Sequence, residues 1–197
     1  MQEVKKILNP GSNMNKLKID NKSEIMKENE FYMIHLAIKS RLNKEVKKLK
    51  KLYQATIDGD RAINFHSRCY NITNTLILIK SAGRRRFGGF TTAQWSSHTR
   101  GEYKDDPNAF VFSLDKQKIY FYKKNGKAIY NYKDYGPKFG YGDFGINYHG
   151  IQEKDLETNE SSSRCSYNYD GDNNALSEDG EASGIYAAEY EVFQVIF

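Results

Sequence analysis

Residues 51–95 decide the fold, and they read KLYQATIDGDRAINFHSRCYNITNTLILIKSAGRRRFGGFTTAQW. The stretch breaks at Asp58-Gly59 and resumes as a short helical pattern from Arg61 to Cys69. Thr75 to Lys80 (TLILIK) is a continuous apolar run of strand length, which is typical of a strand buried on both faces. After a turn, Phe87 to Thr92 predicts another strand, in which two glycines indicate a bulge or a close backbone approach.

The upstream segment predicts a tail followed by a helix. Residues 1–30 are polar and show no sustained period, so we expect a flexible N-terminal tail. Over residues 31–57, apolar residues recur at steps of three and four, which indicates one helix face. They are Ile34, Ile38, Leu42, Val46, Leu49 and Tyr53. Because several lysines lie off this stripe, the pattern predicts a basic amphipathic helical segment that leads into a domain over residues 52–197.

The downstream half is rich in short strand patterns. Lys118 to Lys123 and Ala128 to Tyr132 flank Asn125-Gly126, which predicts a hairpin. Further strand patterns lie at Ala109 to Leu114, Phe144 to Tyr148 and Ile185 to Phe197. Many short strands with helices crowded at one end predict a mostly-β α+β fold, a two-sheet antiparallel β-sandwich flanked by a few helices.

Charge is distributed unevenly along the chain. Residues 1–51 carry thirteen Lys/Arg against six Asp/Glu, whereas residues 152–181 carry nine Asp/Glu against two Lys/Arg. The acidic, Ser- and Asn-rich stretch at 152–183 predicts a loop of low order. A basic N-terminal segment and an acidic loop are suited to steering the protein toward a charged protein partner.

Cysteine usage and hydropathy indicate a cytoplasmic protein with reduced thiols. Two cysteines, Cys69 and Cys165, do not make a disulfide framework. Charged residues interrupt the N-terminus, so it lacks the apolar core of a signal peptide. No stretch reaches the length of a membrane span, and no cofactor is expected.

His66 and Cys69 are the candidate reactive pair. They lie three residues apart on the expected helix and therefore on one face. The imidazole could activate a thiolate as nucleophile or peroxide sensor. Alternatively, Cys69 is a small buried residue and His66 a hydrogen-bonded packing residue. We prefer the second interpretation, and two ligands at this spacing do not make a zinc site.

The acidic loop matches part of a calcium-binding loop. Asp170, Asp172, Asn174 and Glu181 fall at ligand positions, but Ala175 replaces the glycine that the sharp turn needs. We expect no metal site beyond weak calcium binding by these residues. Three arginines at 84–86 precede Gly88-Gly89, but their spacing fits neither the dinucleotide-binding fingerprint nor the P-loop. The chain lacks the sustained basic stripe that would indicate nucleic-acid binding.

Glu189 and Glu191 alternate along the last strand and therefore lie on one face. Two carboxylates on one face could form a glycosidase-type pair. A solvent-facing strand whose acidic side chains contact a partner explains the same pattern without a catalytic role. We prefer this second interpretation.

Several blocks, in order, resemble the TLDc domain, the module of the oxidation-resistance proteins. They are LYQATIDGD, FHSRC, TLILIKS, RFGGFT and Trp95, then DPNAFVFSL at 106–114, GPKFGYGDFGI at 136–146 and EYEVFQV at 189–195. The resembling positions are Asp58, Gly59, Phe65, His66, Cys69, Gly88, Gly89, Trp95, Asp106, Pro107, Phe110, Gly136, Pro137, Phe139, Gly140, Asp143, Glu189, Glu191 and Phe193. The chain departs from the family pattern at residues 71–74 (NITN), where a Gly-Pro is common.

The resemblance implies a two-sheet sandwich, a role in protection from oxidative damage and binding to the vacuolar proton ATPase, with an effect on its assembly. It brings no established reaction, so we expect a non-enzymatic interaction module, with a redox-active thiol as the alternative. The expected contact residues are Lys47, Lys48, Lys50, Lys51, Glu189 and Glu191, together with the acidic loop.

Overall fold

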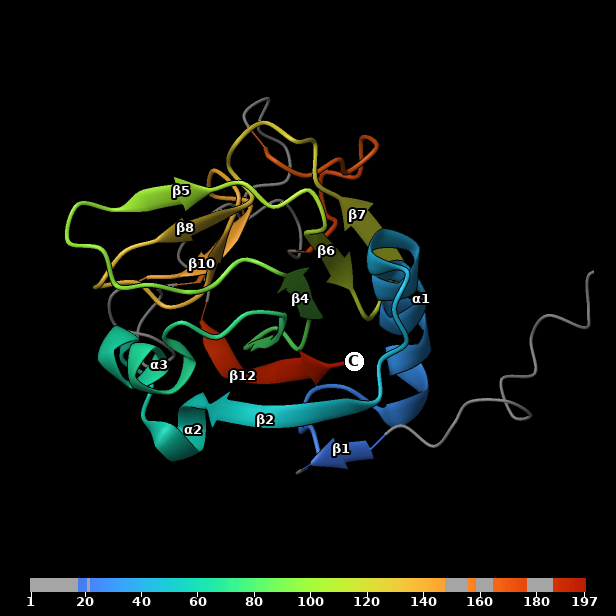
Figure 1. Cartoon of the computed structure of the whole chain (residues 1–197), viewed down its shortest axis with the longest axis horizontal. Helices are drawn as coiled ribbons and strands as arrows, with labels where there is room; N and C mark the ends of the chain where they lie inside the picture. The colour runs from blue at the N-terminus through green and yellow to red at the C-terminus, as the bar shows by residue number, and fades with distance from the viewer. Residues whose placement is uncertain (1–17, 21, 148–155, 159–164, 177–185) are drawn as a thin grey trace, which may run out of the picture.

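The computed structural model describes residues 18–20, 22–147, 156–158, 165–176 and 186–197 (Figure 1). Helical elements in these residues are η2 (Glu28–Glu30), α1 (Phe31–Leu42), α2 (Ala55–Asp58) and α3 (Ala62–Cys69). The strands are β1 (Lys18–Asp20), β2 (Lys48–Gln54), β3 (Thr75–Ser81), β4 (Arg86–Thr91), β5 (Glu102–Lys104), β6 (Phe110–Ser113), β7 (Lys118–Phe121), β8 (Ile129–Asn131), β9 (Lys138–Phe139), β10 (Phe144–Ile146), β11 (Leu156–Thr158) and β12 (Ala187–Ile196).

Within the described residues the strands form two sheets. The large sheet has seven strands in the order β1-β2-β12-β3-β4-β6-β7, and the small sheet has five in the order β11-β10-β9-β8-β5. Neighbouring strands are antiparallel except β1, which runs parallel to β2. The predicted mostly-β α+β sandwich is confirmed.

Both faces of the large sheet are covered. Ile77 and Ile79 of β3 face the small sheet and share a core with Phe139. Leu76 and Leu78, the alternate residues, pack in a second core with Ile34 of α1. Figure 1 shows α1 and the small sheet on opposite sides of the large sheet. The continuous apolar run of β3 follows from this double burial.

The predicted helix over residues 31–57 is wrong beyond Leu42. Asn43 adopts a left-handed conformation (φ 52°), which ends α1, and residues 48–54 form strand β2. The pairing of β2 with β12 skips Leu52, so the strand bulges there. Leu49 consequently packs toward α1, whereas Tyr53 packs between the sheets. A bulged strand with apolar residues four apart imitates the helical period.

The predicted hairpin around Asn125-Gly126 is also wrong. Strand β7 pairs with β6 in the large sheet, while β8 pairs with β5 and β9 in the small sheet. The connecting segment therefore crosses from one sheet to the other. Tyr122 begins this crossing, lies in the inter-sheet core and bonds through its hydroxyl to Asp105 (2.7 Å).

Two segments expected to be poorly ordered are partly folded. Residues 18–30 of the expected tail carry β1 and place Ile25 and Met26 in the core beside α1. Within the acidic stretch, β11 pairs with β10, and Cys165, Tyr167 and Leu176 are buried between the sheets. In both segments, apolar residues that lie among charged and polar ones are buried in a core. In the described part, no helix is long and apolar enough to cross a membrane.

Candidate functional site: a pocket beside a tyrosine-covered sheet face

His66 joins helix α3 to the turn that follows β8. Its Nε2 lies 3.0 Å from the backbone carbonyl oxygen of Tyr132. A carbonyl can only accept, so Nε2 carries the proton and Nδ1 is left as an acceptor. Nδ1 is buried and lacks a hydrogen-bond partner among the described residues. Burial lowers the pKa of His66, which keeps the ring neutral.

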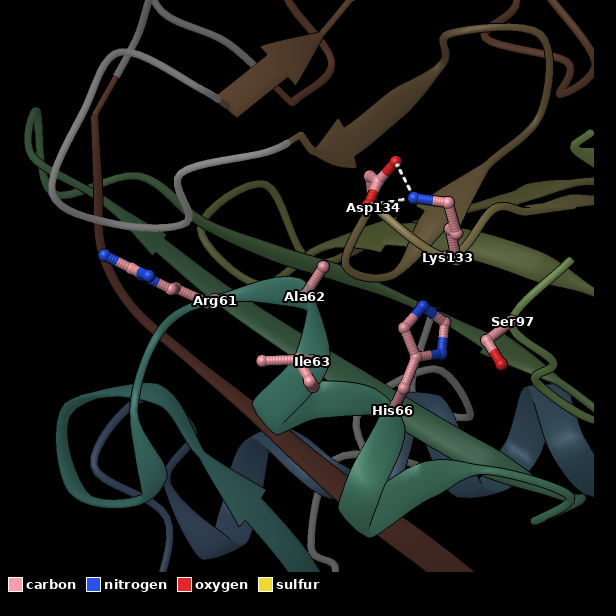
Figure 2. Close-up of a pocket in the computed structure, with 7 residues that line it drawn as sticks. All are labelled: Arg61, Ala62, Ile63, His66, Ser97, Lys133 and Asp134. Carbon is pink, nitrogen blue, oxygen red and sulfur yellow. Dashed lines mark hydrogen bonds and ion pairs between the residues drawn. The ribbon is translucent and has the colours of Figure 1, made fainter. Parts of the chain in front are cut away.

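A pocket of about 470 Å³ opens beside this ring. Its walls are the first turn of α3, Ser97, and the Lys133-Asp134 pair of the turn. Figure 2 shows the imidazole standing between that turn and Ser97, while Arg61 points away from it. Lys133 and Asp134 form an ion pair (2.7 Å), and this hydrogen bond is the main cause that lowers the pKa of Asp134. The pocket therefore places a neutral imidazole, whose Nδ1 is itself buried, beside a mixed pair of charges.

Cys69 points into the inter-sheet core. It is fully buried and belongs to the cluster that contains Phe65 and Trp95. Burial raises the pKa of its thiol. The ring of His66 instead bonds to the backbone of Tyr132, and among the described residues neither of its nitrogens is hydrogen-bonded to Cys69. The interpretation of Cys69 as a buried packing residue fits this geometry.

A cluster of tyrosine rings covers the outer side of the small sheet and its adjoining turns. Its members, here called the tyrosine face, are Tyr103, Tyr130, Tyr132, Tyr135 and Tyr141. Ring centroids are 4.7 Å apart for Tyr103 and Tyr130 and 5.8 Å apart for Tyr103 and Tyr141. Tyr130 lies 6.1 Å from Tyr135, which in turn lies 5.1 Å from Tyr132. The five rings therefore form one packed surface.

Lysines lie over these rings. The Nζ of Lys127 is 4.4 Å from the ring centre of Tyr141 and 5.3 Å from that of Tyr103. Lys138 lies 5.1 Å from the ring centre of Tyr135. Cation–π contacts of this kind hold the lysines on the aromatic surface. His66 is connected to the same surface, because Tyr132 accepts its hydrogen bond.

The lysines predicted to bind a partner lie on or beside strand β2 and differ in their surroundings. Lys47 and Lys50 are exposed, whereas Lys48 forms an ion pair with Asp20. Lys51 is nearly buried and bonds to Glu191 (2.7 Å). The expectation that all four lie on a basic helix is wrong. Lys47 and Lys50 are the two that face solvent.

Glu189 and Glu191 do not face solvent, contrary to expectation. Glu189 accepts hydrogen bonds from Gln54 Nε2 (3.0 Å) and from the backbone and hydroxyl of Thr56. Glu191 is fully buried and accepts from Ser23, from the backbone of Glu24 (3.0 Å) and from Lys51. Both carboxylates hold other segments onto β12, so they are internal connectors and not partner contacts.

The other resembling carboxylates also organise the backbone. Asp106 accepts from Thr91 (2.7 Å) and from the backbone and hydroxyl of Thr92. Asp143 accepts from the backbone nitrogens of Ser166 (2.8 Å) and Tyr167 (3.0 Å). Asp58 accepts from the backbone of Gln54 (2.9 Å) and from Arg68 (2.7 Å).

The remaining resembling residues divide between turns and core. Gly59 and Gly140 have positive φ (93° and 66°), and Gly88 packs against the backbone of Ile77. Pro107 is exposed, whereas Gly136 and Pro137 are buried beside β9. Phe65, Trp95 and Phe139 pack between the sheets, and Phe110 and Phe193 pack under α1. Gly89 lies beside Phe139. These positions therefore build the fold.

The described candidate calcium ligands Asp170 and Asp172 already bond to other groups of the protein. Asp172 bonds to Lys116 (2.7 Å) and to the hydroxyl of Tyr120 (3.0 Å), and it accepts from the backbone of Asn174. Asp170 contacts Asn168 (2.8 Å). Glu181 lies outside the described residues. In the described part of the chain, no group of three or more His, Cys, Asp or Glu side chains is placed to hold a metal ion.

The tyrosine face was missed from the sequence. Tyr130, Tyr132 and Tyr135 follow one another closely, and this spacing was the available signal. Tyr103 and Tyr141 join them only through the pairing of β5 with β8 and through the turn after β9.

Comparison with protein families agrees with the architecture. The model of the TLDc domain matches residues 19–196. Comparison with curated proteins finds no match. The family match spans nearly the whole chain and includes the N-terminal strand β1 and the C-terminal strand β12. The chain belongs to the TLDc domain family.

Proposed function

We propose that this protein is a non-enzymatic interaction module that acts in the cytoplasm, contributes to protection from oxidative stress, and binds the peripheral sector of the vacuolar proton ATPase. The observation that carries the proposal is membership of the TLDc family over residues 19–196. Binding regulates assembly of the ATPase in this proposal.

The buried state of Cys69 favours this proposal over the redox-active thiol. A thiol reacts as its thiolate and needs access to its oxidant. Cys69 is fully buried, and the pKa of its thiol is raised by burial. Both facts oppose reaction with peroxide at neutral pH.

The tyrosine face is the contact surface that we propose. Tyrosine supplies large, amphipathic contact area at a low cost in conformational entropy. The ring contacts order this surface before a partner arrives. Lys127 and Lys138 add positive charge, so the surface suits an acidic protein patch.

The test is a pull-down of the purified peripheral sector with tagged protein in five forms: wild type, Cys69→Ser, Tyr141→Ser, Lys127→Glu and Tyr32→Ser. Tyr141 and Tyr32 are equally exposed (40% and 39%), but Tyr32 lies on α1. Tyr32→Ser is therefore the matched control for loss of an exposed ring.

We expect wild type, Cys69→Ser and Tyr32→Ser to recover the sector, and Tyr141→Ser and Lys127→Glu to recover at least fivefold less. If no form recovers it, the partner is wrong. Equal recovery by all five forms would support the partner and reject the tyrosine face. Loss of binding in Cys69→Ser alone, with the fold intact, would return attention to the thiol.

A further inference from the structure

The first described residues of the chain run along the edge of the large sheet. Strand β1 pairs in parallel with β2, matching Lys18 with Lys48 and Asp20 with Lys50. Figure 1 shows β1 as the outermost strand beside β2. We call the described residues 18–20 and 22–24 the N-terminal arm. It covers a strand edge that would otherwise present unpaired backbone groups.

The arm is held at Ser23. The Ser23 hydroxyl donates to Oε2 of Glu191 and accepts from the backbone nitrogens of Ile25 (3.0 Å) and Met26 (2.8 Å). The backbone nitrogen of Glu24 donates to Oε1 of the same carboxylate (3.0 Å). Glu191 is fully buried, so competition from water for these bonds is reduced.

One cation balances this carboxylate. Lys51 lies 2.7 Å from Glu191 Oε1 and also donates to the carbonyl oxygen of Lys22 (2.8 Å). The Lys51 side chain is 10% exposed and that of Glu191 is 0% exposed. The site is thus a compact, charge-balanced cluster, and among the described residues no second cation bonds to this carboxylate.

The rest of the arm has few side-chain contacts. It borders a hollow of about 770 Å³, lined in part by Ile19, Lys22 and Met26. The ion pair between Lys48 and Asp20 is exposed on both sides (36% and 47%), and such pairs contribute little stability. Besides its backbone pairing with β2 and the contact of Ile19 with the core under α1, the arm is attached to the buried part of the sheet by the hydrogen bonds of Ser23 and Glu24 to Glu191.

The chain is fixed independently just after the arm. Ile25 and Met26 are buried under α1. Arg86 donates to the carbonyl oxygen of Ile25 (3.2 Å) and bonds to Glu30 (2.9 Å). Detachment at Ser23 would therefore free residues 18–24 and leave residues 25–30 in place.

From this geometry we propose that Ser23 is a phosphorylation site, and that phosphate on it releases the N-terminal arm and uncovers the edge of β2. In this step Ser23 Oγ bonds to the terminal phosphorus of a nucleoside triphosphate supplied with a protein kinase. The bond from that phosphorus to the diphosphate breaks, the diphosphate leaves, and the hydroxyl proton passes to a base of the kinase.

The product no longer fits the site. A phosphoserine carries about −1.5 to −2 charges at neutral pH and has lost the proton that Ser23 donates to Glu191. Two anions would then face the single cation Lys51, in a place where burial strengthens repulsion. Ser23 itself is half-buried, between exposed Lys22 and exposed Glu24. The released edge of β2 can accept an added strand from a partner.

The release of the N-terminal arm is tested with the full chain carrying phosphoserine at position 23. Hydrogen exchange is compared with unmodified protein, Ser23→Ala, Ser23→Asp, Glu191→Gln, and Ser23→Asp combined with Glu191→Gln. We expect phosphoserine and Ser23→Asp to speed exchange in residues 18–24 and 48–50 at least tenfold. Exchange in β3 should not change, because β3 lies two strands further into the sheet.

The double variant separates charge repulsion from simple loss of the hydroxyl. A neutral amide at position 191 would remove the repulsion, so Glu191→Gln should restore at least half of the protection lost in Ser23→Asp. Ser23→Ala should accelerate exchange less than Ser23→Asp does. Unchanged exchange on phosphorylation, or failure of Glu191→Gln to restore protection while the single Glu191→Gln variant stays folded, would overturn the release mechanism.

The modification itself is tested by mass spectrometry of the protein purified from its own cells with phosphatases inhibited. Cleavage after lysine yields residues 23–27, SEIMK, in which Ser23 is the sole hydroxyl residue. We expect this peptide with one added phosphate. Its absence, with the unmodified peptide present, would overturn the assignment of Ser23 as a phosphorylation site.

Discussion

Buried carboxylates and glycines carry much of the specific structure at the scale of single residues. Asp106, Asp143, Glu189 and Glu191 each accept hydrogen bonds from segments distant in sequence. Burying a carboxylate costs free energy, and the hydrogen bonds that each of these four accepts offset that cost. Glycines occupy positions where two backbones approach too closely to leave room for a side chain.

Gly88→Ala is expected to destabilise the fold by more than about 3 kcal/mol, because its Cβ would overlap the carbonyl oxygen of Ile77 on the paired strand. The control is Gly126→Ala. Gly126 has open space around it, so only its positive φ (81°) is strained, at about 1 kcal/mol. Urea unfolding measures both. Equal losses would show that the strands separate easily at Gly88.

Asp143 is expected to make stability depend on pH. Burial raises the pKa of its carboxyl from 3.8 to about 6 in the folded protein. The folded state therefore binds its proton more tightly than the unfolded state. The stabilisation is complete below about pH 4 and is lost as pH rises through 6.

Comparison with Asp143→Asn isolates this effect. The free energy of unfolding of wild type minus that of the variant should fall by roughly 1–3 kcal/mol between pH 4 and pH 7. Urea titrations at several pH values give this difference. A difference that stays constant, or rises with pH, would contradict the raised pKa.

At the scale of elements, strand β2 shows how one segment can have two different sides. Its bulge at Leu52 turns Leu49 toward α1 and Tyr53 toward the small sheet. Its lysines divide in the same way, into buried Lys51 and exposed Lys50. Helix α3 performs a related task, since His66 fixes the turn that carries Tyr132.

Lys51→Met should destabilise the protein by about 3–5 kcal/mol, because it leaves Glu191 buried without its cation. Lys50→Met on the same strand should change stability by less than about 0.5 kcal/mol. Thermal and urea unfolding of both variants provide the measurement. A similar small effect of the two substitutions would mean that water or another cation compensates Glu191.

At the scale of the whole molecule, the fold is a large sheet enclosed between α1 and a small sheet. The last strand, β12, lies inside the large sheet, where it pairs with β2 on one side and β3 on the other. The N-terminal and C-terminal parts of the chain therefore stabilise each other. The tyrosine face lies on the small sheet, away from this junction.

Truncation tests that mutual dependence. A chain that begins at Phe31 should lose about 3–5 kcal/mol, because Ile25 and Met26 no longer cover the core under α1 and Arg86 loses Glu30. A chain that begins at Ile25 keeps these contacts and should lose less, because it gives up only the arm and the hydrogen bonds of Ser23 and Glu24 to Glu191. If the two chains unfold at the same urea concentration, residues 25–30 behave as the expected tail.

The sequence alone determined the family, the β-sandwich and most strands, because those depend on local signals. The apolar run of β3, the Asp58-Gly59 break and the glycine pair in β4 each act over a few residues. Their physical causes, double burial, a positive φ and a close backbone approach, can be recognised in the residues themselves.

Only the tertiary structure decided which segments meet. The bulge that makes residues 48–54 a strand depends on pairing with β12, more than 130 residues away. The same long-range pairing buried Glu191 against Ser23 and Lys51, and assembled five tyrosines from three segments into one face. Periodicity records which side of an element is apolar. It does not record the element against which that side will pack. For this reason the sequence wrongly predicted that Lys51, Glu189 and Glu191 contact a partner, whereas all three are internal.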